Sequence, residues 1–387
     1  MKEFKKDLNK ANELRTVGKN SEAVELFEKC YKMHPEEFSF KQKNDYAWAI
    51  YKTKIAFYKD EEELFENAEL ITQLVEQRNF NRVSSCVYTS SVFKVLNHFK
   101  DEDDFPSMIP WLEKLNPDLL DEKPYRKYER WNRSHRELYY DWASRAYYRN
   151  MDFERCIEMS QKALGEVSRF HDDGEAWFKW RIAKSLMELG RIIEALDWCL
   201  EVVKVKHEWY VYRDIAKLYL MLKKPWLSLD YLCPAVLSDV SQKTKMNVYY
   251  LCFRVLKSSN MPMAIKHAEF YLILRRKYGY SIPYEIEMLG IDESTLDEKE
   301  LESEIRDLWI RYKFKNHKIR HGTVAKFFND RNFGFINDES GESIFFHRDE
   351  FKGDEVFVGQ MVSFYREDSF DKSKNKKSVK AVYVRGE

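Results

Sequence analysis

Two short runs of alternating aromatic residues, 332–336 and 344–348, stand near the C-terminus of the chain. Each run has the period of two that is typical of a β-strand, whose successive side chains point to opposite faces. The polar segment 337–341 between them is suited to the turn of a hairpin. Pairing of the two strands would place four flat side chains together on one face: Phe333, Phe335, Phe345 and His347. Because unpaired bases stack on exposed rings, this pattern predicts a surface for single-stranded nucleic acid.

Core packing is the alternative explanation for these rings, because an aromatic ring in a small sheet domain is more often inside than outside. The alternation favours exposure, since Ile336, Ile344 and Phe346 already take the opposite face of the two strands. His347 has no second ligand at a usable spacing, so the sequence predicts no metal site here.

The period of two extends over the whole C-terminal segment and is interrupted by glycines that suit turns. Five strands can be drawn, at 321–328, 332–337, 343–347, 360–366 and 378–384. About 65 residues in five short antiparallel strands are typical of a small closed barrel of the OB type. An all-β domain of this kind is therefore expected at residues 319–387.

Residues 321–385 resemble a cold-shock domain, a family that binds single-stranded nucleic acid. The resemblance rests on the segments 331–336 (RNFGFI), 344–347 (IFFH) and 359–364 (GQMVSF). It implies a phosphate contact by Arg331 and base stacking on the four side chains named above.

The sequence departs from the family pattern at several places. In an ungapped alignment Lys326 falls where the family has a Trp, whereas Phe327 takes that place if gaps are allowed. Arg348 replaces a Phe after the histidine, although a guanidinium group can also stack on a base. The loop before Gly359 offers no clear equivalent of the family's loop Phe. The expected nucleic-acid site consists of Lys326, Phe327, Arg331, Phe333, Phe335, Phe345, His347 and Arg348.

The charge of the chain is balanced, with 65 basic and 65 acidic residues. A contact with nucleic acid must therefore come from local clusters of charge. Segment 311–331 has seven basic residues and one acidic residue, and 372–377 is a second basic run. The rest of the C-terminal segment is acidic enough to neutralise them, so binding should be modest and salt-sensitive.

The chain up to about residue 275 has helical periodicity, without strand signals, and carries a worn internal repeat. The repeat is clearest where small residues flank a turn glycine, as at Ala11, Gly18 and Ala23 and again at Ala183, Gly190 and Ala195. In another unit Met151 stands where the turn glycine belongs. These spacings resemble the tetratricopeptide repeat, a helix–turn–helix unit that stacks into a superhelix. About seven helix pairs are expected in an all-α solenoid at residues 1–280.

A solenoid of this type has a concave face lined by the first helix of each pair. Counting back from the small residues places a mostly basic groove on that face, with Tyr249 and Phe253 at its far end. One interpretation is a groove for an acidic peptide or a phosphate backbone. The other is a solvated face whose charges pair with their neighbours. The groove residues are Arg145, Tyr148, Arg149, Lys184, Arg213 and Lys217.

A second kind of helix is expected between the repeats and the strands. Segment 294–297 has the pattern of a capping box, and an apolar stripe follows it that includes Leu301, Ile305 and Trp309. Such a helix can cover the open end of the last repeat. Residues 281–318 would form this capping helix and a basic connector.

Several functional classes are not indicated by the sequence. The six cysteines are scattered without a Cys-x-x-Cys pair, as expected for buried thiols in a reducing compartment. No apolar run has the length of a membrane span and the N-terminus has no signal peptide, so we expect a soluble, cytoplasmic protein. Motifs of nucleotide, metal or nucleophilic catalysis are missing, so we expect neither enzymatic activity nor a cofactor. Two Arg-to-His spacings, 130–135 and 311–317, match a pair that some ribonucleases use, but chance explains them.

The sequence thus predicts a cytoplasmic adaptor. Its barrel would bind single-stranded RNA or DNA by stacking, and its helical repeats would bind a protein partner or extend the nucleic-acid path. The alternative is a protein–protein interaction scaffold, for example in a stress or defence system, whose barrel has little affinity for nucleic acid.

Overall fold

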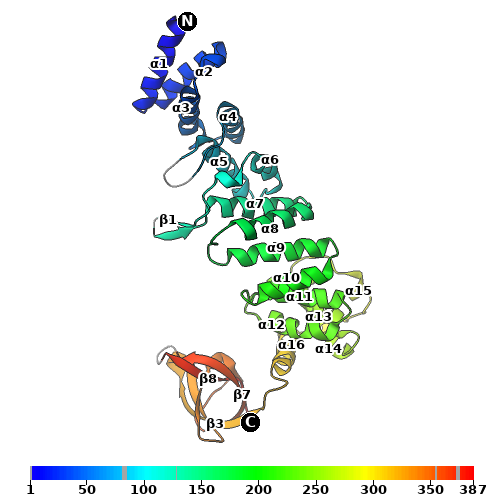
Figure 1. Cartoon of the computed structure of the whole chain (residues 1–387). Helices are drawn as coiled ribbons and strands as arrows, with labels where there is room; N and C mark the ends of the chain where they lie inside the picture. The colour runs from blue at the N-terminus through cyan, green and yellow to red at the C-terminus, as the bar shows by residue number, and fades with distance from the viewer. Residues whose placement is uncertain (1, 81–84, 128, 354, 372–374) are drawn as a thin grey trace. The chain divides into compact units, whose positions relative to one another are not determined.

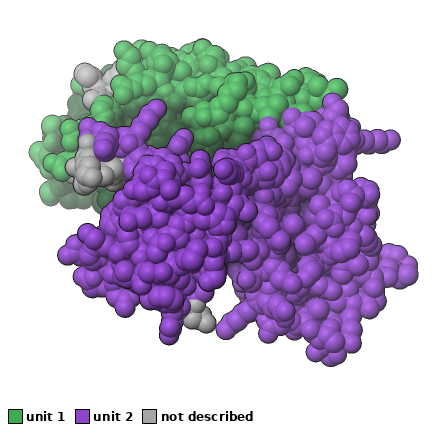
Figure 2. Space-filling model, turned by 90° about the horizontal axis from the view of Figure 1, so that it is seen from below, with its two compact units in different colours: residues 1–207 green, residues 208–387 purple. Residues whose placement is uncertain are grey.

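The structure is a computed structural model that describes residues 2–80, 85–127, 129–353, 355–371 and 375–387. It divides into two compact units, Met1–His207 and Glu208–Glu387, coloured green and purple in Figure 2. Among the described residues, no helix has both the length and the apolar character that a membrane crossing requires. All six cysteines are buried.

The first unit is built from successive helix pairs (Figure 1). Each of the pairs α1–α2, α7–α8 and α9–α10 packs along its length, and α8 also packs on α9. The described helices are α1 (Lys2–Thr16), α2 (Asn20–Met33), α3 (Phe40–Ile50), α4 (Glu61–Leu74), α5 (Val87–Asp101), α6 (Ile109–Leu112), α7 (His135–Arg149), α8 (Phe153–Glu166), α9 (Gly174–Glu188) and α10 (Ile192–Val203).

A short β-hairpin interrupts the array between α6 and α7. It consists of β1 (Tyr125–Lys127) paired antiparallel with β2 (Arg130–Asn132). The expectation that this region has no strands was wrong. Strands of three residues are too short to show a period of two in the sequence, so no pattern marked them.

The second unit continues with helices and ends in a sheet. Its described helices are α11 (Trp209–Met221), α12 (Pro225–Leu237), α13 (Gln242–Leu256), α14 (Met261–Lys277), α15 (Tyr284–Glu287) and α16 (Glu298–Lys313). With the pairs α11–α12 and α13–α14, the described residues form seven successive helix pairs, as the repeat predicted.

The regular helix pairs cross at small residues. In each of five pairs, two fully buried small residues are separated by 12 positions: Ala11 and Ala23, Ser144 and Cys156, Ala183 and Ala195, Ala216 and Ser228, Cys252 and Ala264. Close approach is visible at one crossing, where the Ser228 hydroxyl donates a hydrogen bond of 2.9 Å to the Ala216 carbonyl. Larger side chains at these positions would push the helices apart, which explains why the repeat has small residues there.

The turns within the pairs need a left-handed backbone. Gly18 and Gly190 have φ values of +83° and +73°, which glycine adopts readily. Met151 and Lys223 take the corresponding turns with φ values of +60° and +57°. Both side chains are exposed, so no packing compensates for the unfavourable conformation.

Replacing these two residues with glycine should stabilise the protein. A left-handed residue with a Cβ costs about 1–2 kcal/mol, and the extra freedom of glycine in the unfolded chain offsets about half of that. We expect Met151→Gly and Lys223→Gly each to raise the melting temperature of its unit by about 2 °C in calorimetry. The matched control, Gly190→Ala, should lower it; equal or lower stability of the glycine variants would contradict this account.

Helix α16 covers the end of the repeats, as predicted. Leu301, Ile305 and Trp309 are buried in one apolar cluster with residues of α13 and α14. The helix begins one turn later than the sequence suggested, because Asp297 is its N-cap and accepts a hydrogen bond of 2.8 Å from the Glu300 amide. The capping box expected at Ser294 instead forms a separate short turn around Asp292.

The contact between α16 and α14 contains one fully buried histidine. The Trp309 indole N–H donates to Nε2 of His267 over 2.8 Å, and Nδ1 of His267 lies 2.7 Å from the Met263 carbonyl. Both ring nitrogens are therefore satisfied by a neutral imidazole. Burial lowers the pKa of His267 from 6.5 to about 4.

Stability of the second unit should fall in mild acid. Below pH 6.5 the unfolded chain binds a proton at His267 that the folded chain does not, until the pH reaches about 4. Between pH 6.5 and about pH 4 the free energy of unfolding should fall by about 1.4 kcal/mol per pH unit, or about 3 kcal/mol in total. We expect His267→Gln, which keeps an acceptor for the indole, to flatten this dependence in urea denaturation between pH 7 and pH 5. The exposed His317→Gln is the control and should behave as wild type.

The described C-terminal sheet has six strands, of which β3, β4, β5, β7 and β8 are paired in a ring and β6 pairs with β8. Neighbouring strands follow the order β5–β4–β3–β7–β8–β6, and an additional pairing of β5 with β8 closes the ring. The bounds are β3 (Arg320–Phe328), β4 (Phe333–Asp338), β5 (Ser343–His347), β6 (Phe351–Lys352), β7 (Met361–Asp371) and β8 (Lys376–Gly386). The last two long strands extend further than predicted and pair with each other along most of their length.

The sheet domain packs on the capping helix through β7 and β8. Val382 and Tyr383 share an apolar cluster with Ile310 and Phe314, and the Phe314 ring stacks on Tyr365 at 4.6 Å between centroids. Two ion pairs flank the cluster, Arg385 with Asp307 at 2.9 Å and Lys313 with Glu367 at 2.5 Å. The strands that carry the predicted binding residues, β4 and β5, take no part in this cluster.

Candidate nucleic-acid interface

Three phenylalanines form a continuous outer surface on β4 and β5. The ring centroids of Phe333 and Phe335 are 5.9 Å apart, and Phe345 lies 5.5 Å from the former and 5.9 Å from the latter. All three rings are partly exposed, whereas Ile336 and Phe346 of the alternate positions are fully buried. The two faces therefore divide as the alternation predicted.

Phe328 at the end of β3 adds a fourth ring that the sequence pattern did not indicate. It pairs across the strands with Phe333, its ring centroid lies 5.1 Å from that residue, and 38% of the side chain is exposed. We call Phe328, Phe333, Phe335 and Phe345 the platform. A period of two counted back from Phe333 could not reveal Phe328, because a turn separates the two strands.

Phe327 does not belong to the platform. Its ring packs against the core, stacked on Phe346 at 6.0 Å and 15°. The cause is a bulge in β3 between Val324 and Lys326, which shifts the register against β4. After the bulge Lys326 lies opposite Phe335 on the outer face, in agreement with the ungapped alignment. The placement of Phe327 at the binding surface is therefore corrected.

Cationic and polar groups stand around the platform. Lys326 is exposed beside Phe335. Arg331 is exposed in the turn before β4, with its Nε 3.4 Å from the Asp330 carboxylate. His347 lies opposite Phe333, exposed, with Nδ1 3.1 Å from Asp349. These three residues lie where the sequence placed them, at positions that can meet phosphate or base edges.

Arg348 has a structural role instead of the predicted stacking role. Its guanidinium donates hydrogen bonds to the carbonyls of Phe351, at 3.2 Å, and Gly353, at 2.8 Å. It also lies over the Phe351 ring, with 5.6 Å between the guanidinium carbon and the ring centroid. These contacts hold the segment that follows β5, and no sequence pattern could indicate them.

The second basic run is only partly described. Lys372, Ser373 and Lys374 lie outside the described residues, and Lys376 and Lys377 are exposed at the start of β8. In the described part of the chain, no group of three or more His, Cys, Asp or Glu side chains is arranged to hold a metal ion.

The two neighbouring phenylalanines of β3, Phe327 and Phe328, should contribute differently to the stability of the sheet domain. Phe327→Ala removes a ring that packs on the core, so we expect a loss of about 2–3 kcal/mol in unfolding free energy. Phe328→Ala removes an outer ring and should change stability by less than about 1 kcal/mol. Hydrogen exchange of the β3 and β4 amides along a urea series, read by mass spectrometry, measures both, because residues 319–387 contain no tryptophan. Equal losses would mean that the two rings are equally buried.

The groove residues of the first unit are largely neutralised by carboxylates. Asp141 is buried and lies 2.6 Å from Arg181, 2.9 Å from Arg133 and 3.3 Å from Arg145. Although burial opposes its ionisation, the three guanidinium groups hold the pKa of Asp141 below its ordinary value. Arg149 lies 3.4 Å from Asp103. These contacts favour the interpretation in which the charges of this face pair with neighbours.

Lys184 is the exception among the predicted groove residues of the first unit. Its ammonium nitrogen lies 5.7 Å from the centre of the Tyr148 ring and 5.5 Å from that of Trp180, an arrangement of a cation beside two aromatic rings. In the second unit Arg213 pairs with Asp214 at 2.6 Å, and Lys217 is exposed.

Tyr249 and Phe253 do not line a groove. Both are 2% exposed and belong to the core of the second unit. The counting from small residues failed here because helix α13 lies between α12 and α14 and near the capping helix, so its apolar residues are covered on more than one side.

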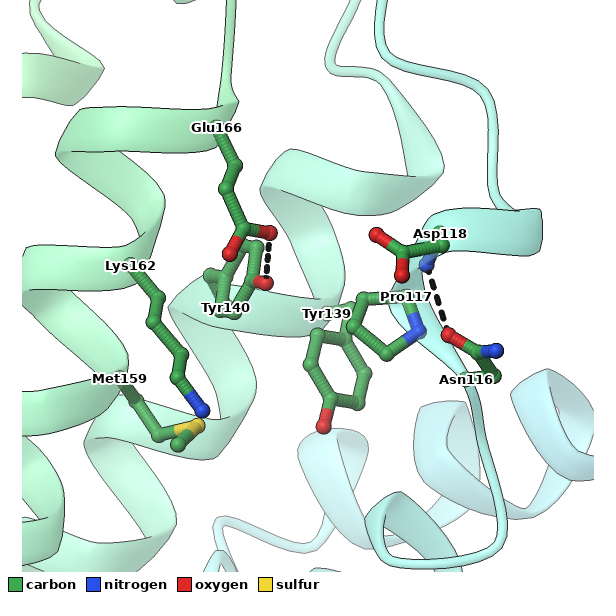
Figure 3. Close-up of a pocket in the computed structure, with 8 residues that line it drawn as sticks. All are labelled: Asn116, Pro117, Asp118, Tyr139, Tyr140, Met159, Lys162 and Glu166. Carbon is green, nitrogen blue, oxygen red and sulfur yellow. Dashed lines mark hydrogen bonds between the residues drawn. The ribbon is translucent and has the colours of Figure 1, made fainter.

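A small cavity of about 240 Å³ lies in the first unit near α7 and α8 (Figure 3). Figure 3 shows the Tyr140 hydroxyl hydrogen-bonded to Glu166 on one side, and the Asp118 amide donating to the Asn116 side chain on the other. Burial raises the pKa of Tyr139 to about 12, so its hydroxyl stays protonated. No sequence motif marks this cavity, which is lined by Asn116, Pro117, Asp118, Tyr139, Tyr140, Met159, Lys162 and Glu166.

Family models match two parts of the chain. Residues 320–386 match the model described as 'Cold-shock' DNA-binding domain, and residues 176–313 match a domain of unknown function (DUF7017). The chain is thus a helical-repeat protein with a C-terminal sheet domain, and that sheet domain is a cold-shock domain. The match confirms the resemblance that the motifs around Phe333 and Phe345 indicated. A search of curated proteins finds no match.

Comparison with solved structures finds several that match the helical array, one of them a TPR2AB domain. The TPR2AB domain of yeast Sti1 in complex with pHSP90 has a TM-score of 0.28 at 14% identity, covering 66% of this chain and 98% of that one. The APC/C hetero-tetramer Cut9–Hcn1 has a TM-score of 0.35 at 16% sequence identity, and the match covers 65% of this chain and 42% of that one. The human IFIT1 dimer with m7Gppp-AAAA has a TM-score of 0.39 at 14% sequence identity, and the match covers 76% of this chain and 67% of that one. This chain therefore spans less than half of the Cut9–Hcn1 chain.

Proposed function

We propose that the protein is a non-enzymatic adaptor that binds single-stranded RNA or DNA through the platform of its cold-shock domain. The observation that carries the proposal is the set of four adjacent phenylalanine rings on the outer face of β3, β4 and β5. Rings that are already partly exposed on a rigid sheet can accept bases without rearrangement of the core. The match of this segment to a DNA-binding family supports the same class of ligand.

Affinity should come from stacking with a local electrostatic contribution. Each stacked base contributes about 1–3 kcal/mol, whatever its identity, so little sequence preference is expected. Lys326, Arg331 and His347 are the charged or titratable groups beside the rings that can reach phosphates. With so few charges, the salt dependence should be clear but limited.

The helical repeats would supply the second half of the adaptor, either by binding a protein partner or by extending the nucleic-acid path. Partly exposed cationic and aromatic groups such as Lys184 and Tyr148 support such a surface. The pairing of Arg145 and Arg149 with carboxylates limits how basic it can be.

The absence of catalysis is part of the proposal. The Arg130–His135 spacing places the histidine in a packed setting, since its ring contacts Phe80 and Phe93 at 4.6 Å and 5.2 Å between centroids. Nδ1 of His135 lies 2.5 Å from the Asp121 carboxylate, which also accepts from the His135 backbone amide. These contacts explain the histidine as an anchor of the start of α7.

Fluorescence anisotropy with a labelled pyrimidine-rich oligonucleotide tests the platform. We expect Phe333→Ala/Phe345→Ala to weaken binding by about 30-fold or more, because two stacking surfaces are removed. The matched control removes two exposed phenylalanines of the first unit, Phe40→Ala/Phe57→Ala, and should bind as wild type.

The same titrations at low and high salt distinguish the contribution of stacking to the affinity from the contribution of charge. If the platform variant and wild type bind equally, stacking on these rings is excluded. If wild type itself shows no binding at low salt, the alternative of a protein–protein interaction scaffold is favoured, with a cold-shock domain that has lost its ligand. Parallel assays with RNA and DNA of the same sequence report any preference between them.

A further inference from the structure

The hairpin of β1 and β2 carries an exposed cluster of arginine and tryptophan that the platform does not involve. It projects from the stacked helices beside α7 (Figure 1). Arg126 and Trp131 are paired across the two strands, so their side chains leave the same face. The guanidinium carbon of Arg169, from the loop after α8, lies 5.7 Å from the centre of the Trp131 ring. Trp131 remains 54% exposed, and both arginines are exposed.

The base of the hairpin is fixed to the core of the first unit. The Tyr125 ring lies parallel to the His135 ring, with 5.8 Å between centroids and 6° between planes. His135 in turn contacts the buried Phe93. The neighbouring Arg136 donates to the carbonyls of Pro117 and Leu120 at 3.1 Å and 3.3 Å. The outer face with Arg126 and Trp131 is therefore presented on a supported element, which lowers the entropy lost on binding.

The charges of this cluster are not compensated by the described part of the chain. Within the described residues, no carboxylate lies within ion-pair distance of Arg126, Arg130 or Arg169. Arginines in the surrounding helices behave differently, since each has a carboxylate partner: Arg133, Arg136, Arg145, Arg149 and Arg155. Arg126 and Arg169 lie on the side of Trp131, without a carboxylate within ion-pair distance in the described residues. A bound anion would relieve the repulsion between these like charges.

We infer that this cluster is a second contact for single-stranded nucleic acid, in which a base stacks on Trp131 and phosphates meet Arg126 and Arg169 beside it, while Arg130 is a further exposed cation on the opposite face of the hairpin. The inference takes its class of ligand from the proposed function but uses a separate surface in the other unit. A nucleotide supplies both a flat ring and an anion, which are the two groups that this face lacks. Planar guanidinium groups bind phosphate in a forked geometry and also stack on bases.

An acidic protein segment is the competing ligand, because it would also neutralise the arginines. It offers no flat ring for the exposed indole, and its carboxylates would leave most of the Trp131 surface in water. The nucleic acid therefore explains the tryptophan and the arginines together, whereas the acidic segment explains the arginines alone.

The first experiment measures affinity and salt dependence with the full-length chain. The probe is a labelled pyrimidine-rich RNA of about 20 nucleotides. Arg126→Ala/Arg130→Ala/Arg169→Ala should weaken binding by about 10-fold or more and lower the slope of log affinity against log salt by about 2. The matched control, Lys5→Ala/Lys6→Ala/Lys10→Ala, removes the same charge from exposed lysines of α1 and should change affinity by less than about 2-fold. Melting curves verify that both triple variants fold.

The second experiment tests the tryptophan. Trp131→Ala should weaken binding by about 5-fold or more, and Trp131→Phe should restore most of the loss, because a ring of either kind can stack. In RNA that contains 4-thiouridine, ultraviolet cross-linking followed by mass spectrometry should identify a peptide that includes Trp131.

Combination with the platform variant distinguishes the two proposals. If Phe333→Ala/Phe345→Ala weakens binding and the hairpin triple variant binds as its lysine control does, the inference is wrong and the proposed function stands. If only the hairpin triple variant weakens binding, the inference stands and the platform proposal fails. Binding of a poly-glutamate peptide that depends on the three arginines, with unchanged RNA binding, would assign the hairpin to an acidic protein segment and overturn the inference.

Discussion

The close approach of β3 and β4 at Gly334 sets the geometry of the C-terminal domain. A Cβ at this position would lie 2.5 Å from the Lys326 carbonyl oxygen and 2.6 Å from the Phe346 ring, so only glycine fits. This contact fixes the register of the two strands after the bulge in β3. Because side chains alternate with a period of two, the register decides at once which rings lie outside and which fill the core. The outward position of the platform rings therefore depends on the absence of a side chain at Gly334.

The remaining surfaces of the second unit are arranged so that this platform stays accessible. The sheet domain uses β7 and β8 for its contact with α16, and α16 uses its opposite stripe to cover α12 and α14. One helix thus belongs to two cores. The buried pair of Trp309 and His267 anchors it on the side of the repeats, which makes the support of the cold-shock domain sensitive to acid.

Sequence patterns predicted the parts of this protein that depend on local periodicity. The alternation around Phe333 and Phe345, the small residues such as Ala183 and Ala195, and the turn at Gly190 all have a local physical cause. Features that depend on tertiary contacts escaped prediction. A one-residue bulge placed Phe327 in the core and Phe328 on the surface, and backbone carbonyls accept the hydrogen bonds of Arg348. Asp141 and Asp103 pair with Arg145 and Arg149, which were expected to line a basic groove. The β1–β2 hairpin escaped because its strands are too short for any period to be visible.

Closure of the five strands into a ring also has a consequence for solubility. A sheet that displays four phenylalanines would ordinarily invite association with other copies, through unpaired backbone groups at its edges as well as through the rings. Here β5 is paired with β4 on one side and meets β8 on the other, where Phe345 lies opposite Lys380. Where β8 meets β5 at Phe345, another strand cannot add backbone hydrogen bonds to the apolar contact. The platform can thus remain exposed while β5 is paired on both sides at Phe345, which limits strand-to-strand association.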